Sequence, residues 1–335
     1  MVLAACKTSG SAAKGAPKEG ELGLPPANVT RERMPTRALG KTGARVSIVG
    51  LGGFHIGMQK DEAESIRIVK TAVERGITFF DNCWDYNKGQ SEERMGKALE
   101  GGGREKVFLM TKLDGRTKDV AAAQLEQSLK RLRTNVIDLV QIHEIIRPGD
   151  PEACFAAGGC IEALVEAKKQ GRIRFIGFTG HKSPDIHLAM LAAAEAHGFE
   201  FDTVQMPLNV MDAHFRSFEK NVLPVAVKKG MGVLGMKSIG SGTLLESKKV
   251  TARECLNYAL SLPTSVVITG CDSVGVLEQA VDVALKFRPM PPADVAELLA
   301  RTRDAAKDGA YETFKTSKKH DGTDENPHWL TTAKV

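Results

Sequence analysis

The stretch from Gly76 to Tyr86, GITFFDNCWDY, decides the fold. Its apolar part, Ile77–Phe80, has the aromatic and β-branched residues of a short strand that is buried on both faces. The strand ends in the carboxylate of Asp81, and Tyr86 follows five residues later. An unpaired charge at the end of a buried strand is costly, so Asp81 is expected to have a partner from elsewhere in the chain.

Two later apolar runs end in the same manner. KVFLMTK ends in Lys112, and VIDLVQIH ends in His143. Taken singly, each of these side chains has a plainer interpretation, as a strand-end ion pair, a surface lysine, a core histidine or a packing tyrosine. Together, a carboxylate, a phenol, an ammonium and an imidazole at successive strand ends predict one site that is assembled from distant segments.

Strand-like and helix-like patterns alternate along the rest of the chain. Strands are predicted at 46–51, 77–81, 106–112, 136–143, 173–179, 202–206, 231–237 and 265–269. Helices are predicted at about 61–75, 91–100, 119–133, 159–170, 184–197, 214–229, 251–261 and 273–286, with caps at Ser91, Ser183 and Thr251. This alternation predicts parallel pairing and a closed (β/α)8 TIM barrel, in which chemistry sits at the carboxyl ends of the strands.

Additions at both ends of the barrel are also expected. A β-hairpin, RALGKTGARVSIVG, should turn at 41–43 before the first barrel strand. Pro291 and Pro292 should separate the last barrel helix from another at about 293–306. A polar tail follows, and its aromatic residues Phe314 and Trp329 are candidates to anchor it over the barrel mouth.

Length and composition favour one globular barrel. Residues 37–335 are interpreted as a single (β/α)8 barrel with its tail, and residues 1–36 as a disordered leader that lacks periodicity. The net charge of +5 is spread along the chain, which argues against a nucleic-acid-binding face. No apolar run approaches the ~20 residues that span a bilayer. A cytoplasmic protein is expected, with an exported lipoprotein anchored through Cys6 as the alternative, because LAAC resembles a bacterial lipobox.

The six cysteines show neither a CxxC pair nor a histidine partner at zinc spacing. Reduced thiols and no metal are therefore expected, with oxidised pairs left open. Cys83 is interpreted as a small buried filler, because no base stands near it at a recognisable spacing.

The strand-end residues suit carbonyl reduction. A tyrosine hydroxyl has a pKa near ~10, and a nearby ammonium would lower that pKa and make the phenol a usable general acid. Asp81 would hold the ammonium of Lys112, and His143 would orient or polarise a carbonyl oxygen. Such a set lacks a hydride source, which a nicotinamide cofactor would have to supply.

The chain resembles an aldo-keto reductase over roughly residues 37–286. The hairpin, FFDNCWDY, GQSEERMGKAL, VIDLVQIHE, RIRFIGFTGH, DTVQMPLN and GMKSIGSGTL match the family pattern in this order. The resemblance implies a catalytic tetrad of Asp81, Tyr86, Lys112 and His143, with Tyr86 as acid or base. It also implies a set of cofactor-binding residues, namely Gly53, Thr179, Gln205, Met236, Lys237, Ser238, Gly240, Gly242, Asp272 and Gln279.

Three departures from the family pattern bear on the cofactor. Gly180 stands where Asn is frequent, and Met236 stands where an aromatic ring often stacks on nicotinamide. The adenosine-binding stretch ITGCDSVGVLEQA lacks basic residues, and Asp272 in it would repel a 2′-phosphate. NADPH is the cofactor that the resemblance implies, and NADH is the alternative.

Two other functions compete with a reductase barrel. VSIVGLGG could open a Rossmann fold, but His55 replaces the third glycine and no helix is predicted before about Asp61. A nucleotide-binding sensor could keep the barrel and cofactor without turnover, which the intact tetrad argues against. A small carbonyl compound or alcohol is the expected substrate, while its identity and the oligomeric state are not predicted.

Overall fold

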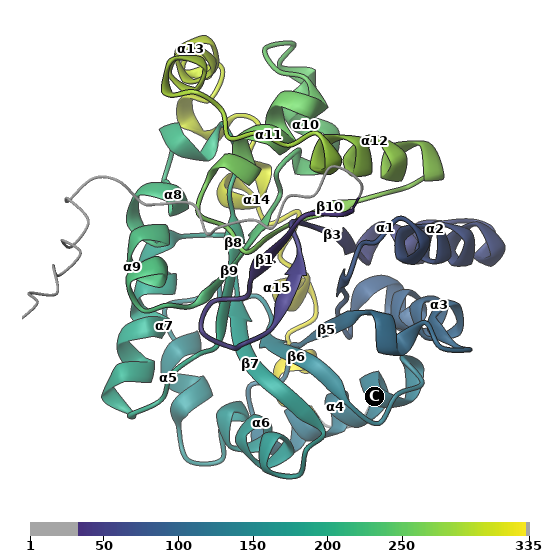
Figure 1. Cartoon of the computed structure of the whole chain (residues 1–335). Helices are drawn as coiled ribbons and strands as arrows, with labels where there is room; N and C mark the ends of the chain where they lie inside the picture. The colour runs from purple at the N-terminus through teal and green to yellow at the C-terminus, as the bar shows by residue number, and fades with distance from the viewer. Residues whose placement is uncertain (1–32, 333–335) are drawn as a thin grey trace, which may run out of the picture.

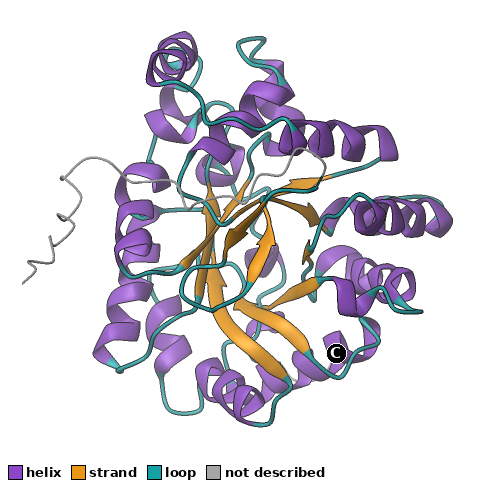
Figure 2. Ribbon diagram, viewed as in Figure 1, coloured by secondary structure: helices purple, strands orange, loops and turns teal. Residues whose placement is uncertain are grey.

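Eight parallel strands form a closed barrel in the computed structural model, which describes residues 33–332. The strands run in the order β10-β3-β4-β5-β6-β7-β8-β9 and are surrounded by helices (Figures 1 and 2). They are β3 (Val49–Gly52), β4 (Phe79–Asp81), β5 (Phe108–Leu113), β6 (Ile137–Ile142), β7 (Ile173–Thr179), β8 (Thr203–Pro207), β9 (Gly232–Met236) and β10 (Val266–Gly270). The predicted (β/α)8 barrel is therefore confirmed.

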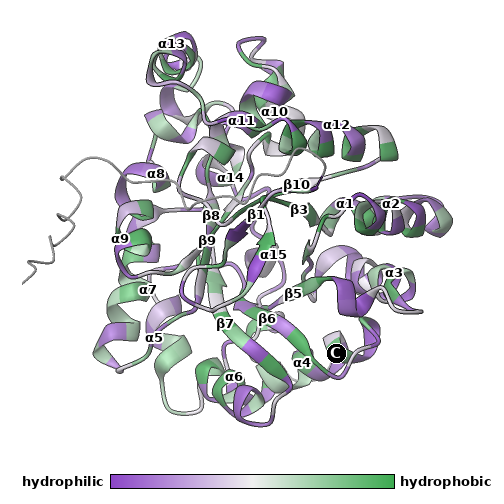
Figure 3. Ribbon diagram, viewed as in Figure 1, coloured by the Kyte–Doolittle hydropathy of each residue, from purple (hydrophilic) through white to green (hydrophobic). Residues whose placement is uncertain are grey.

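The helices lie outside the strands and after them in the chain. They are α1 (Phe54–Met58), α2 (Glu62–Glu74), α3 (Gln90–Leu99), α4 (Lys118–Arg131), α5 (Asp150–Phe155), α6 (Cys160–Lys169), α7 (Pro184–Ala196), α8 (Phe218–Asn221), α9 (Leu223–Lys228), α10 (Thr243–Glu246), α11 (Ala252–Ser261), α12 (Val274–Leu285) and α13 (Pro292–Thr302). The tail adds α14 (Thr313–Thr316), α15 (Gly322–Glu325) and α16 (His328–Thr331). Figure 3 shows that the outer helices carry both hydrophobic and hydrophilic residues, as expected for helices with one buried face.

Two of the three predicted caps are confirmed. The Ser183 hydroxyl accepts a hydrogen bond from the Asp185 amide at the start of α7, and Thr251 forms a reciprocal capping box with Glu254 in α11. The prediction for Ser91 was wrong, because this residue lies inside α3 and its hydroxyl donates to the carbonyl oxygen of Gly53 at 2.6 Å.

A hairpin closes the amino-terminal end of the barrel. Its strands are β1 (Thr36–Ala38) and β2 (Arg45–Ser47), and the turn residue Leu39 is fully buried among the apolar side chains inside the barrel. The buried guanidinium of Arg37 donates to the carbonyl oxygen of Thr264 at 2.9 Å and fastens the hairpin to the barrel wall. The hairpin therefore forms a floor that covers the amino-terminal end of the barrel.

Residues before the predicted boundary at residue 37 already pack on the barrel. Met34 packs in the hydrophobic core, and β1 begins at Thr36. The rest of the predicted leader, with Cys6, lies outside the described residues.

Three predicted elements differ from the structure. The predicted strand 46–51 belongs to two elements, β2 of the hairpin and β3 of the barrel, because the chain bends at Ile48. The five-residue helix α1 follows β3 directly, where no helix was predicted before Asp61. The predicted helix 214–229 is broken into α8 and α9, since Pro224 starts a new helix and cannot continue the hydrogen-bond pattern of the previous one.

None of the helices within residues 33–332 is both long enough and apolar enough to cross a lipid bilayer.

A partly buried acid outside the barrel, Glu219, gives a testable pH dependence. Tyr258 on α11 donates its hydroxyl to Glu219 on α8 at 2.7 Å, and burial raises the pKa of Glu219 to about 7. The unfolded chain releases this proton near pH 4.5. Between these two values only the folded state holds the proton, so the free energy of unfolding falls as pH rises through this window.

Glu219→Gln should remove the loss of stability that ionisation of this carboxyl group causes, while it keeps an oxygen acceptor for Tyr258. We expect unchanged stability at pH 5 and a gain of about 1 to 3 kcal/mol at pH 8, measured by urea unfolding. The exposed Glu297→Gln is the control and should have no effect at either pH. An equal effect of Glu219→Gln at both pH values would show that ionisation of Glu219 does not destabilise the folded protein.

Candidate active site

Three of the predicted residues meet at the carboxyl end of the barrel. Asp81 ends β4 and Lys112 lies near the end of β5. The Lys112 ammonium is paired with the Asp81 carboxylate, and it also donates to the Tyr86 hydroxyl oxygen at 3.2 Å. Lys112 and Asp81 are 1% and 3% exposed, so this is a buried ion pair with the phenol at its edge.

Tyr86 begins a short 3₁₀ turn, η1 (Tyr86–Gly89), and packs edge-on against Phe54 with ring centroids 5.4 Å apart. Burial raises the pKa of Tyr86 well above its ordinary value, and the carboxylates of Asp81 and Asp85 act in the same direction. The expectation that Lys112 lowers this pKa was therefore wrong for the protein without a ligand. Because Lys112 donates to the phenol oxygen, the phenol keeps its own proton to donate elsewhere.

His143 follows β6, and its Nδ1 faces a cluster of polar side chains. Nδ1 lies 2.9 Å from Asp114 Oδ1, 3.2 Å from Cys83 Sγ and 3.7 Å from Asp85 Oδ1. Burial alone would lower the pKa of His143, but the carboxylates of Asp114 and Asp85 outweigh it and raise this pKa. Within residues 33–332, Nε2 makes no hydrogen bond, so it is the nitrogen left for a ligand.

Cys83 was predicted to be a small filler because no base stands near it in the sequence, but the fold places a base beside it. His143 Nδ1 lies within hydrogen-bonding distance of the thiol. Even so, burial raises the pKa of Cys83 well above its ordinary value, and the nearby carboxylates of Asp85 and Asp114 add to this effect. The thiol is therefore held protonated and is a poor nucleophile.

Sequence reasoning missed the partners of His143. Asp114 stands two residues after Lys112, just past the end of β5, and a carboxylate in that position was an available signal. Asp85 directly precedes Tyr86, and Glu144 directly follows His143. Neither shows a pattern that predicts its contacts, because these depend on how separate segments meet at the barrel mouth.

Thr179 and Met236 end β7 and β9, and Gln205 lies in the middle of β8 between these two strands. Thr179 pairs in register with Gln205, and its hydroxyl lies 4.0 Å from the Met236 sulfur. The Gln205 amide nitrogen donates to Asp81 at 3.3 Å, while its buried amide oxygen has no hydrogen-bond partner among residues 33–332. This oxygen is an open acceptor next to the ion pair.

The predicted diphosphate-binding loop follows β9. Gly240 and Gly242 lie in the short 3₁₀ turn η4 (Gly240–Gly242) and have φ angles of +60° and +95°. Ser238 before them is buried. Burial lowers the pKa of Lys237, which forms no ion pair with any of the described residues. A cation in this position is suited to an anionic ligand.

The remaining predicted cofactor residues lie toward β3, β10 and α12. A Cβ on Gly53 would lie 2.6 Å from the Asp81 carbonyl oxygen, so the close approach of β3 to β4 requires glycine there. The His55 ring occupies the space of a side chain at Gly270. Asp272 is exposed just after β10, whereas Gln279 is exposed on α12 and has no hydrogen bond to the other site residues within the described chain.

The tail covers part of the mouth, as predicted from its aromatic residues. Trp329 packs edge-on against Trp84 with ring centroids 5.7 Å apart, and Phe314 is buried with its ring 5.6 Å from the Lys237 ammonium. Glu144 accepts hydrogen bonds from the amides of Gly322 and Thr323 at 3.0 and 2.8 Å. These contacts tie the tail to the residue that adjoins His143.

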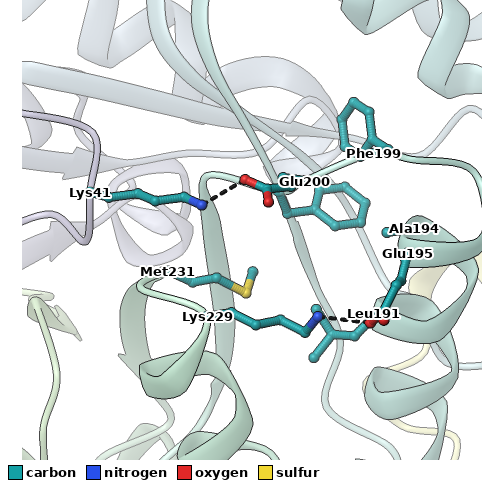
Figure 4. Close-up of a pocket in the computed structure, with 9 residues that line it drawn as sticks. Lys41, Leu191, Ala194, Glu195, Phe199, Glu200, Lys229 and Met231 are labelled. Atoms are coloured by element: carbon teal, nitrogen blue, oxygen red, sulfur yellow. Dashed lines mark hydrogen bonds and ion pairs between the residues drawn. The ribbon is translucent and has the colours of Figure 1, made fainter.

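A pocket of about 110 Å³ lies at the opposite end of the barrel, where β8 and β9 begin (Figure 4). Two ion pairs, Lys41–Glu200 and Lys229–Glu195, border it. Since its charged side chains are already paired and exposed, this pocket offers no reactive group.

Known proteins resemble the chain in both sequence and fold. The model of the Aldo/keto reductase family matches residues 48–257. Aldo-keto reductase AFTS1 of Alternaria alternata is 29% identical over 258 residues, which cover 65% of this chain and 68% of that protein. Aldo-keto reductase YhdN of Bacillus subtilis is 32% identical over 226 residues, which cover 63% of this chain and 64% of that protein.

A solved structure, the holo form of aldo-keto reductase AKR11C1 from Bacillus halodurans, superimposes with a TM-score of 0.67 at 23% identity. The match covers 79% of this chain and 95% of that one, and at this identity it supports the fold alone. The family match spans well over half of the chain and includes the segments that carry Asp81, Tyr86, Lys112 and His143. The chain belongs to the aldo/keto reductase family, whose members are oxidoreductases.

Proposed function

We propose that this protein is an NADPH-dependent reductase of aldehydes or ketones that also runs in reverse, with Tyr86 as the general acid and base. The observation that carries the proposal is the hydrogen-bonded chain from Asp81 through Lys112 to the Tyr86 hydroxyl, beside the open Nε2 of His143. NADH is the alternative cofactor.

A bound nicotinamide would supply the hydride. Tyr86 donates its phenol proton to the carbonyl oxygen as that oxygen gains charge. Lys112 already donates to the phenol oxygen, so it stabilises the phenolate that remains, and Asp81 holds the ammonium in place. In alcohol oxidation the same phenolate accepts the proton.

His143 orients the substrate from the other side. Its raised pKa favours the doubly protonated ring, in which Nδ1–H remains on Asp114 while Nε2–H donates to the carbonyl oxygen. Two hydrogen-bond donors, Tyr86 and His143, thus converge on one oxygen. Their rings pack edge-on with centroids 6.0 Å apart.

The residues present fit a nicotinamide dinucleotide. The unpartnered oxygen of Gln205 is an acceptor for the carboxamide N–H group, next to the Thr179 hydroxyl. Lys237 and the loop through Gly240 and Gly242 would hold the diphosphate with an ammonium and backbone amides. Asp272 would lie near the adenosine ribose, where its carboxylate disfavours a 2′-phosphate.

The direct test mixes the purified chain with NADPH or NADH and a panel of aldehydes and ketones, and follows the loss of reduced-cofactor absorbance. We expect turnover on at least one small carbonyl compound. Cofactor binding without turnover on any compound would favour the nucleotide-binding sensor instead.

The placement of the adenosine segment predicts a change in cofactor preference. Asp272→Arg, or separately Val276→Arg, should strengthen NADPH binding relative to NADH, because a guanidinium pairs with the 2′-phosphate. An exposed charge pair contributes about 1 kcal/mol, and removal of the Asp272 carboxylate adds a comparable amount. We therefore expect the ratio of the two dissociation constants to shift roughly 10-fold in Asp272→Arg.

The exposed Asp294→Arg on α13 makes the same charge change elsewhere and should leave that ratio unaltered. An unchanged ratio in both Asp272→Arg and Val276→Arg would show that this segment does not bind the adenosine end.

A further inference from the structure

Two buried thiols meet across the short loop that joins α5 to α6. Cys154 lies in α5 and Cys160 begins α6, and both side chains are at most 1% exposed. Only five residues separate the two cysteines in the sequence. Their sulfurs are in hydrogen-bonding contact, with the thiol of Cys154 as the donor and the sulfur of Cys160 as the acceptor.

The backbone holds Cys160 against the end of α5. The Gly159 amide donates to the Ala156 carbonyl oxygen at 2.8 Å, and a Cβ on Gly159 would lie 2.5 Å from the Cys154 carbonyl oxygen. On its other side, the Cys160 amide donates to the Arg116 carbonyl oxygen at 2.9 Å. The contact between the two sulfurs is therefore fixed by the path of the chain as well as by the side chains.

The two sulfurs differ in how readily they ionise. Their hydrogen bond raises the pKa of Cys154 well above its ordinary value and lowers the pKa of Cys160. Burial acts against ionisation of both thiols, but the Arg116 guanidinium favours the thiolate of Cys160. Cys160 is thus the more acidic thiol of the pair, and Cys154 keeps its proton.

The other described cysteines lack this arrangement. Burial raises the pKa of Cys255 to about 12 and that of Cys271 to about 12. The pKa of Cys83 is also raised well above its ordinary value by burial. Within residues 33–332, Cys160 alone combines a lowered pKa with a second thiol in contact, so it is the sulfur best suited to react with an oxidant.

We propose that Cys154 and Cys160 form a reversible disulfide when the protein meets hydrogen peroxide, with Cys160 as the sulfur that reacts first. The Cys160 thiolate attacks one peroxide oxygen, so that a sulfur–oxygen bond forms, the oxygen–oxygen bond breaks, and the departing hydroxide takes up a proton to become water. The sulfur of Cys154 then attacks the resulting sulfenic acid, and the second hydroxide leaves as water with the Cys154 proton. Overall, two thiols lose two electrons and two protons, and hydrogen peroxide becomes two water molecules.

The loop between the cysteines can accommodate this chemistry. A disulfide bond is about 2.05 Å long, so the sulfurs must approach more closely than in their hydrogen bond. Residues 156–158 are exposed, and Gly158 has no side chain to obstruct a small shift. Local opening of these exposed residues would also admit a molecule as small as hydrogen peroxide to Cys160.

The experiment uses the full chain, reduced with dithiothreitol, freed of the reductant and treated with hydrogen peroxide. Free thiols are then blocked in denaturant, and the digested protein is examined by mass spectrometry. The peptide that contains both cysteines should lack two hydrogen atoms and carry no blocking group, and dithiothreitol should restore both thiols. Two free thiols after treatment, or a sulfinic acid on Cys160 beside a free Cys154, would overturn the proposal.

Variants separate the two steps. Cys154→Ser should stop at the sulfenic acid of Cys160, which dimedone captures. Cys160→Ser should slow oxidation of Cys154 at least ~10-fold, because the thiolate is the nucleophile. Cys255→Ser removes another buried thiol and should leave the rate of disulfide formation unchanged. Equal rates of Cys154 oxidation with and without Cys160 would contradict the proposed order.

A measurement on the unmodified protein covers the case in which a serine variant does not fold. A limiting amount of iodoacetamide should label Cys160 before Cys154, since only the more acidic thiol supplies a thiolate readily. Labelling of Cys154 first would overturn the assignment of Cys160 as the reacting sulfur.

Discussion

Replacement of Tyr86 by Phe is expected to lower turnover of carbonyl substrates at least ~10²-fold, the scale of losing a positioned general acid. The change removes one oxygen and leaves the ring to pack on Phe54. Lys112 keeps its ion pair with Asp81 and its hydrogen bond to the Asn82 carbonyl oxygen at 2.8 Å, so the remaining groups at the mouth should stay in place. The dissociation constant of the cofactor should therefore change little while kcat falls.

The matched control is Tyr258→Phe, which removes the hydroxyl of a buried tyrosine that pairs with Glu219 outside the mouth. It should alter stability and leave kcat near that of the unmodified protein. Steady-state kinetics and a direct cofactor titration distinguish the two variants. If Tyr86→Phe retained a tenth or more of the turnover, another group would have to be the acid.

Replacement of Lys315 by Met is expected to destabilise the protein by about 3 to 5 kcal/mol, the usual loss when one member of a buried ion pair is removed. The Lys315 ammonium lies 2.6 Å from Asp212 and 2.9 Å from Glu312, and all three side chains are at most 1% exposed. It also donates to the Phe215 carbonyl oxygen at 2.8 Å. Without the ammonium, two carboxylates would face each other in the interior.

Urea unfolding at pH 8 measures this loss of stability. The control is Lys319→Met, which changes an exposed lysine four residues further along the tail. Its free energy of unfolding should lie within about 0.5 kcal/mol of that of the unmodified protein. Burial already raises the pKa of Glu312 to about 7, and loss of the cation would push it higher. The Glu312 carboxylate can then be neutralised by a proton in mild acid. The loss of stability in Lys315→Met should therefore be smaller at pH 5 than at pH 8. Equal stabilities of the two variants at pH 8 would mean that the buried ammonium contributes nothing.

Most of the fold could be predicted because its signals are local. The strand β7 was predicted at its observed bounds, and helix starts such as α7 and α11 carry their own capping residues. The division between β2 and β3 could not be predicted, since Val46 and Val49 are equally apolar. One lies in the hairpin floor and the other in the barrel wall, and only closure of the barrel separates them.

The candidate site was predictable at the level of single strand ends. Asp81, Lys112 and His143 were placed there from the apolar runs before them, and the barrel brings them to one mouth with Tyr86. The surroundings of these groups were not predictable. The raised pKa of Tyr86 arises from burial and from carboxylates on separate segments, which the sequence order keeps apart.

The hairpin floor limits where the chain can be shortened by proteolysis. A product that begins at Arg33 keeps Met34, Arg37 and Leu39, and with them the contacts that seal the amino-terminal end. Cleavage after Gly40 would remove all three side chains and let water reach the aromatic stack of Phe79 and Phe108 inside the barrel. Proteolytic removal of amino-terminal residues must therefore stop before Met34 if water is to remain excluded from the barrel interior.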